Sequence, residues 1–95
     1  MTRILAVQIQ TQHGVVAARQ RAREIAALLG FEPHDQTRLA TAVSEIARNA
    51  FEYGRGGTAE FFVSGVSNPQ SFLIRITDKG RGIANLQDIL DGNFQ

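Results

Sequence analysis

The stretch LATAVSEIARNAFEYGRGG, residues 39–57, contains the change of pattern that decides the fold class. Its apolar residues recur at intervals of four, three, four and three, which is the spacing of one face of an α-helix. These residues are Leu39, Val43, Ile46, Ala50 and Tyr53. The glycine-rich residues 54–57 end the pattern, because glycine loses the most backbone freedom in a helix. The stretch therefore predicts a helix followed by a turn, and we expect Asp35 to be the N-cap.

The residues after this turn follow the alternation of β-strands. Three apolar residues at every second position alternate with a second set: Ala59, Phe61 and Val63 with Glu60, Phe62 and Ser64. Residues 67–70, Ser-Asn-Pro-Gln, are typical of a turn, and another strand is expected from Phe72 to Thr77. Two strands joined by a short turn predict a β-hairpin.

The residues on either side add three more expected elements. Period-two alternation predicts a strand from Arg3 to Ile9. Helical spacing predicts a helix from Val15 to Leu29, and Gly30 stands where a left-handed residue would end it. A short helix is expected from about Asn85 to Leu90, with Asn85 as its cap.

The order of these elements decides between fold classes. The expected order is strand, helix, helix, strand, strand, glycine-rich loop and helix. This order lacks the alternating strand-helix-strand units of a parallel sheet. The sequence therefore predicts an α+β fold, a two-layer sandwich with helices packed on one face of a mixed, mostly antiparallel sheet. Ninety-five residues correspond to a single domain.

Composition excludes several classes of protein. The chain has no cysteine, which removes disulfides, thiolate metal sites and thiol nucleophiles. A net charge of +1 does not favour binding to nucleic acid or to an anionic membrane. No apolar run has the length of a membrane span or a signal peptide, so we expect a cytoplasmic protein. The arginines at positions 19, 21 and 23 are expected on a solvated helix face rather than in one patch.

Glu45 and Asn49 form the first candidate constellation. They are four residues apart, so they lie one above the other on one side of the expected helix, at the border between core and solvent. The amide oxygen of Asn49 could bind Mg²⁺, and the carboxylate of Glu45 could deprotonate a hydroxyl one turn away. From spacing alone, the residues are also explained by an ordinary solvated helix flank, and spacing by itself favours that interpretation.

Asp78-Lys79-Gly80-Arg81-Gly82 is the second candidate constellation, directly after an expected strand. The glycines would let the backbone approach a flat or charged ligand, and Asp78 could accept a hydrogen bond from an exocyclic amine. The segment matches neither the dinucleotide-binding glycine pattern nor the P-loop. A plain surface turn is the other interpretation that the residues leave open.

Taken together and in this order, the two constellations resemble the GHKL, or Bergerat-fold, ATP-binding family. Residues 42–50, AVSEIARNA, resemble its N box, and residues 78–83, DKGRGI, resemble its first glycine box. Within the family the chain is most similar to the anti-sigma-factor serine/threonine kinases, the branch of RsbT-like switch kinases, through residues 19–24, 35–38 and 41–45. The alternative within the family is a sensor histidine kinase domain, which often has lysine where this chain has Glu52.

The resemblance implies a role for each matching residue and two cofactors, ATP and Mg²⁺. Asn49 would coordinate Mg²⁺, and Glu45 would be the catalytic base. Asp78 would accept the adenine amino group. Gly80 and Gly82 would let the loop pass close to the base, and Ile83 would wall the adenine pocket.

The resemblance also implies a function and partners. We expect an ATP-dependent serine/threonine kinase that acts by partner switching, for example in stress-response signalling. It would phosphorylate a small antagonist protein and then act on a second regulator, a sigma factor or a phosphatase. The alternative function is a non-catalytic binding module for these proteins. The family's second glycine box is not found before Gln95, so residues 1–95 are expected to be the N-terminal part of one ATP-binding domain.

The hairpin carries a further expectation about assembly. Both of its strands have a half-buried pattern, and they are rich in apolar residues: Phe61, Phe62, Val63, Phe72 and Ile74. The family's later strands are not among these residues, so an open hairpin edge is expected. Such an edge can pair with another chain, and we expect a symmetric homodimer.

Overall fold

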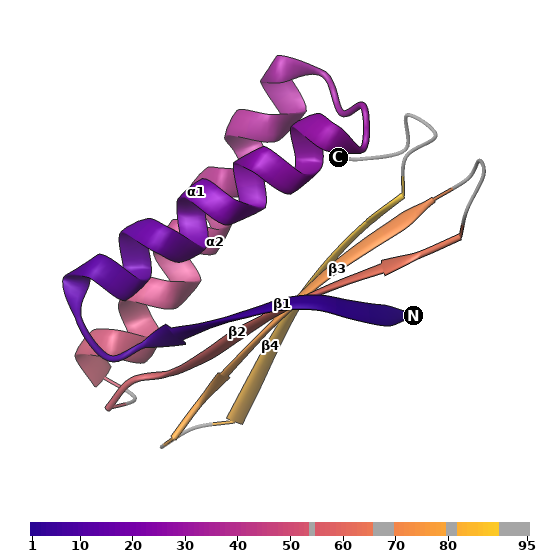
Figure 1. The fold of residues 1–95 in the computed structure, drawn as a ribbon. Coiled ribbons are helices and arrows are strands. Elements are labelled where there is room, and N and C mark those ends of the chain that lie inside the picture. The colour runs from indigo at the N-terminus through magenta and orange to yellow at the C-terminus, as the bar shows by residue number, and fades with distance from the viewer. Residues whose placement is uncertain (54, 66–69, 80–81, 90–95) are drawn as a thin grey trace.

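The computed structural model describes residues 1–53, 55–65, 70–79 and 82–89, the last of these in their backbone. The chain runs through a strand, two helices and three further strands (Figure 1). Their bounds are β1 (Thr2–Ile9), α1 (Gln12–Leu28), α2 (Pro33–Tyr53), β2 (Gly57–Ser64), β3 (Ser71–Asp78) and β4 (Gly82–Ile89). The strand before the helices and the hairpin after them are confirmed.

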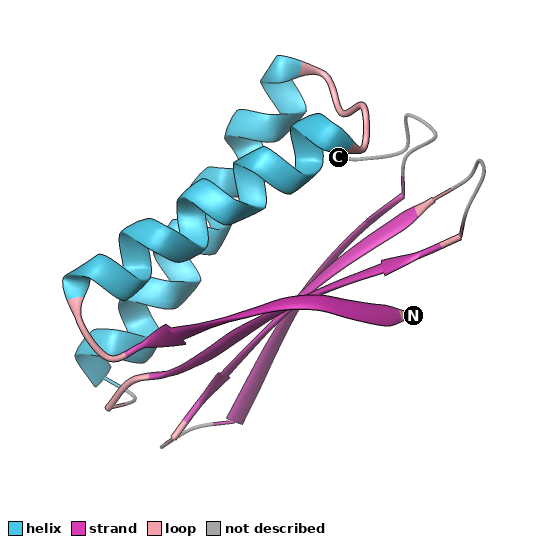
Figure 2. Cartoon of the chain, in the orientation of Figure 1, coloured by secondary structure: helices cyan, strands magenta, loops and turns pink. Residues whose placement is uncertain are grey.

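The four described strands form one sheet in the order β1-β2-β3-β4. Each neighbouring pair is antiparallel. Both helices lie on the same side of this sheet, side by side (Figure 2). The α+β class and the two-layer arrangement are therefore confirmed.

The two helices begin earlier than the sequence pattern indicates. Thr11 is the N-cap of α1, and its hydroxyl oxygen accepts a hydrogen bond from the Gly14 amide at 3.3 Å. α2 begins at Pro33, and the Gln36 amide donates to the Glu32 carbonyl oxygen at 2.9 Å. The expectation that Asp35 is the N-cap is wrong. Proline suits the first helical position, which needs no amide donor, and Asp35 lies in the first turn, where its charge favours the helix dipole.

The last described element differs in type from the expectation. The predicted helix from Asn85 to Leu90 is wrong for residues 85–89, which belong to β4, while Leu90 lies outside the described residues. β4 pairs with β3 from Asp78↔Gly82 to Ser71↔Ile89. The capping signal at Asn85 is local, and it is outweighed by the row of backbone donors and acceptors that β3 offers.

Pairing of β4 changes the expectation about the hairpin edge. β2 has β1 on one side and β3 on the other, and β3 has β4 on its second side. The open edge expected for the hairpin is therefore wrong within the described residues, where the outer strands are β1 and β4. Any pairing with a second copy has to use one of those two strands.

Aromatic side chains join the helix layer to the sheet. Phe72 of β3 packs edge-on against Phe31, which lies between the helices, with ring centroids 6.3 Å apart and planes at 86°. The ring of Phe61 lies 6.4 Å from that of Phe72 at 28°. The largest fully buried side chains come from both layers: Phe61, Phe72, Ile9, Leu39, Ile74 and Val43. The core thus lies between the helices and the sheet.

One residue of the expected core stripe lies outside the core. Tyr53 is 69% exposed, whereas Leu39, Val43 and Ala50 are buried and Ile46 is partly buried. A spacing that averages 3.5 residues drifts about 20° per heptad around a helix of 3.6 residues per turn. After two heptads, Tyr53 has turned away from the sheet.

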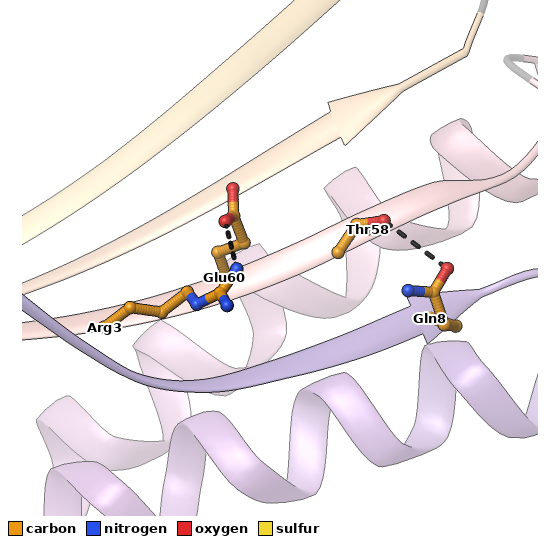
Figure 3. Close-up of polar contacts among 4 residues, drawn as sticks. All are labelled: Arg3, Gln8, Thr58 and Glu60. Carbon is orange, nitrogen blue, oxygen red and sulfur yellow. Dashed lines mark hydrogen bonds and ion pairs between the residues drawn. The ribbon is translucent and has the colours of Figure 1, made fainter.

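The other face of the sheet carries polar contacts between β1 and β2 (Figure 3). Arg3 and Glu60 form a salt bridge at 3.0 Å, and the Thr58 hydroxyl donates to the Gln8 side-chain oxygen at 3.5 Å (Figure 3). The guanidinium of Arg75 lies 5.1 Å from the ring centre of Phe62. The salt bridge is exposed, so it contributes at most about 1 kcal/mol to the stability of the fold. Its main effect is on the register in which β1 pairs with β2.

Candidate functional site

α2 positions the first pair of candidate residues. Glu45 and Asn49 are both exposed, while Val43, Ala47 and Ala50 of the same helix are buried in the core. Four residues correspond to a rise of about 6 Å along the helix axis. A rigid, well-packed helix therefore presents a carboxylate and an amide to solvent one turn apart.

Glu45 lies in a surface groove between the two helices. The groove has a volume of about 450 Å³ and takes its lining equally from α1 and α2. The lining residues are Gln12, Val15, Val16, Arg19, Thr41, Ser44, Glu45 and Arg48. Asn49 is not one of them, so the two candidate residues border different surroundings: Glu45 faces the groove, and Asn49 lies beyond it on α2.

Asp78 is the last residue of β3 and is partly buried. Its cross-strand neighbours are Gly57 in β2 and Gly82 in β4. Neither neighbour has a side chain, so no Cβ on an adjacent strand crowds the Asp78 carboxylate. A Cβ added at Gly57 would lie 2.9 Å from the Asp78 Cα and against the Thr77 carbonyl oxygen. The backbone of β2 therefore packs directly against the end of β3 at Asp78.

The loop before β2 connects the end of α2 to the end of β3. The Gly56 amide donates to the Ala50 carbonyl oxygen at 2.7 Å, and the Lys79 amide donates to the Gly56 carbonyl oxygen at 3.1 Å. Arg55 and Gly56 have positive φ, 64° and 90°, as the tight return of the chain requires. One residue, Gly56, therefore ties the helix turn that follows Asn49 to the residue that follows Asp78.

The remaining candidates belong to the first glycine box. Gly82 is the first residue of β4, and Ile83 follows it opposite Thr77. Gly80 lies outside the described residues. The described part of the box thus comprises the end of β3, the turn residue Lys79 and the start of β4.

Sequence reasoning did not single out two features of this region. Gly57 was expected only in a turn, yet it sets the contact between β2 and the end of β3. Arg19 and Arg48 line the groove with Glu45, although Arg19 was expected on a featureless solvated face. Two adjacent glycines directly before an apolar strand were the available signal for the first feature. The second depends on two helices meeting, which no local pattern reveals.

The described part of the chain has neither a cluster of metal-ligating side chains nor a helix that could cross a membrane. Within residues 1–53, 55–65 and 70–79, no three His, Asp or Glu side chains come together in a way that could hold a metal ion. Neither described helix combines the length and the apolar character needed to cross a membrane.

Comparison with known families bears on this arrangement of helix, hairpin and glycine box. The family model of the histidine kinase-like ATPase domain matches residues 10–94. The chain belongs to this family. The match includes both helices and the described candidates Glu45, Asn49, Asp78 and Gly82, and it confirms the resemblance to the GHKL proteins.

A curated relative within the family agrees with the branch that the sequence indicates. The chain is 35% identical over 88 residues to serine/threonine-protein kinase RsbT of Bacillus subtilis (strain 168). The aligned part covers 93% of this chain and 66% of the relative. The chain therefore spans just under two thirds of the length of that kinase. No solved structure matches the chain significantly.

Proposed function

We propose that the full-length protein is an ATP-dependent serine/threonine kinase and anti-sigma regulator that phosphorylates a small antagonist protein. The observation that supports this most is the family match across residues 10–94, which contains Glu45, Asn49 and Asp78 in the order of the two boxes. The likeness to a serine/threonine kinase over 93% of the chain supports protein phosphorylation within that family.

Each candidate residue has one role in this proposal. When bound, Mg-ATP supplies the phosphoryl group. Asp78, at the end of β3 between Gly57 and Gly82, accepts a hydrogen bond from the adenine amino group. Asn49 offers its side-chain oxygen to Mg²⁺.

The remaining residues act on the substrate hydroxyl and around the adenine. Glu45 holds the incoming Ser or Thr hydroxyl and accepts its proton at a carboxylate oxygen. Its exposure in the groove makes it accessible to another protein. Gly80 and Gly82 let the backbone pass the adenine, and Ile83 closes one side of the adenine pocket.

Partner switching requires a second regulator, a sigma factor or a phosphatase, that binds after the antagonist has been phosphorylated. Assembly as a homodimer remains part of the proposal. In the described sheet it would use β1 or β4, because β2 and β3 are both paired on two sides. Sedimentation of the full-length protein at high micromolar concentration tests this part, and a monomer would contradict it.

The central test is transfer of phosphate from radiolabelled ATP to an antagonist protein that is co-expressed with the full-length protein. The protein should label a Ser or Thr of the antagonist, and Glu45→Ala should reduce the rate by about 10²- to 10⁴-fold with nearly unchanged ATP affinity, as for loss of a general base. Glu32→Ala is the matched control, since Glu32 is exposed at the start of α2 and outside the groove. Stable binding of the antagonist without transfer would instead favour a non-catalytic binding module.

A further inference from the structure

The groove between α1 and α2 contains charges that the roles proposed above do not use. Besides Glu45 it is lined by two arginines, Arg19 from α1 and Arg48 from α2. Both are exposed, and neither takes part in a salt bridge with any residue in the described part of the chain. Two guanidinium groups and one carboxylate of the same groove are therefore exposed to an incoming ligand.

The two arginines lie at opposite ends of the groove. α1 and α2 are joined by a short loop and run antiparallel, so Arg19 lies near Thr41, and Gln12 lies near Arg48. Thr41 and Arg48 are seven residues apart, which corresponds to about 10 Å along the helix. Glu45 lies between the two ends, opposite Val16, which is 43% exposed.

We propose that this groove binds the phosphoacceptor segment of the protein substrate, and that this segment is extended, with acidic residues on both sides of its Ser or Thr. The proposal rests on the function above, because it makes Glu45 the group that receives the hydroxyl. It adds the class of substrate sequence and assigns Arg19 and Arg48 to its recognition.

The geometry fixes how far the acidic residues stand from the hydroxyl. An extended chain rises about 3.3 Å per residue, so 10 Å corresponds to roughly three residues. With the hydroxyl at Glu45, carboxylates one or two positions before and after it come within reach of Arg19 and Arg48. Arginine binds carboxylates through a planar pair of donors, which gives direction as well as attraction.

The other lining groups suit an extended backbone. The Thr41 and Ser44 hydroxyls and the Gln12 amide can exchange hydrogen bonds with main-chain groups, and Val15 and Val16 provide a small apolar floor. A segment with basic residues beside its hydroxyl would face both arginines and be repelled. Charge complementarity therefore selects the acidic segment.

The test uses two fluorescein-labelled peptides and the full-length protein without nucleotide. One peptide carries a central serine with two aspartates on each side, and the other has asparagine in place of each aspartate. We expect the aspartate peptide to bind more tightly, and Arg19→Glu or Arg48→Glu each to weaken it by about 5- to 20-fold at low salt. Raising the ionic strength to about 0.5 M should remove most of that difference, because these charges are exposed.

Arg21→Glu is the matched control. It makes the same change of charge on α1, but Arg21 lies outside the groove and forms an exposed salt bridge with Glu24 at 3.0 Å. It should leave peptide affinity within about twofold of the parent protein, since the salt bridge that it removes is exposed and weak. Circular dichroism of every variant checks that the helices are retained.

Several results would contradict the proposal that this groove is the docking site of the substrate segment. Equal affinity for the two peptides would do so, as would an Arg21→Glu effect equal to that of Arg19→Glu. So would an effect of the groove arginines on ATP affinity instead of peptide affinity, which would assign them to the nucleotide phosphates.

Phosphate transfer to the aspartate peptide is measured separately, so that the two proposals can fail independently. Peptide binding that depends on the arginines but leads to no transfer supports the docking site and contradicts the kinase. Transfer that is unaffected by reversing both arginines supports the kinase and contradicts the docking site.

Discussion

The surroundings of Asp78 in the sheet are set by two glycines. Asp78 is flanked across the sheet by Gly57 and Gly82, so no Cβ stands directly opposite it at the end of β3. An aspartate at the end of an ordinary strand would have two Cβ atoms beside it. At the residue scale, the candidate adenine contact therefore depends on Gly57 and Gly82 as well as on Asp78 itself.

The first prediction at this scale concerns Asp78→Asn in the full-length protein. The change keeps the size of the side chain but places an amide donor where the adenine amine needs an acceptor. ATP affinity should fall by about 1–3 kcal/mol, measured by calorimetry. Asp35→Asn is the control, because Asp35 lies in the first turn of α2, whereas the opposite end of that helix is tied to the Asp78 end of β3. Unchanged ATP affinity would remove Asp78 from the site.

The second prediction at this scale separates metal from nucleotide. Asn49→Ala removes one candidate oxygen ligand from an exposed position, with little effect on packing. Binding of Mg-ATP should weaken more than binding of ATP in a chelator, because the lost contact is to the ion. Equal losses in the two titrations would show that Asn49 contacts the nucleotide itself or only supports the helix.

At the scale of elements, the connection between α2 and β2 decides where the two boxes stand. The hydrogen bonds of Gly56 to Ala50 and Lys79 hold the end of the helix against the end of β3. Gly57 then brings β2 so close to Thr77 and Asp78 that a Cβ has no space. This short loop, more than either box, sets the spacing between Asn49 and Asp78.

The prediction for this element is the effect of Gly57→Ala. The added methyl group must displace the Thr77 carbonyl and the Asp78 backbone, so urea unfolding should show a loss of about 1–3 kcal/mol. ATP affinity should also fall in the fraction that remains folded, because Asp78 moves. Thr58→Ala, the neighbouring change on the open face, should leave ATP affinity unaltered. A Gly57→Ala protein with the parent's unfolding midpoint would contradict the close contact.

At the scale of the whole molecule, stability comes from one core between two layers. Phe72 contacts Phe31 from the helical side and Phe61 from the sheet, and both Phe61 and Phe72 are almost fully buried. A defect at Phe72 therefore loosens both layers together, including the helix that carries Glu45 and Asn49.

Phe72→Ala should therefore destabilise the protein by about 3–5 kcal/mol in urea unfolding, through lost contacts and a cavity. Phe62→Ala is the control, because Phe62 is only partly buried and lies on the face opposite the core, beside Arg75. Phe62→Ala should lower the free energy of unfolding by clearly less than Phe72→Ala does. Similar losses for the two variants would mean that the open face is covered in the full-length protein.

The sequence alone determined the features that depend on neighbours along the chain. Periods of 3.6 and 2 identified α1, α2, β1, β2 and β3, because each pattern reflects which side of a local element is buried. The positions of Glu45 and Asn49 on one side of α2 followed from the same arithmetic. The order of the two boxes indicated the family, which comparison with known proteins then confirmed.

The tertiary structure decided what depends on partners far apart in the chain. β4 is a strand because β3 offers it a row of backbone hydrogen bonds, while the local residues favoured a helix. Asp78 has a glycine on each side across the sheet because Gly57 and Gly82, 21 and 4 residues away, pair across from it. Arg19 and Arg48 share a groove only because α1 and α2 fold back on each other. A local pattern records the burial of one element, but it does not record which other element covers it.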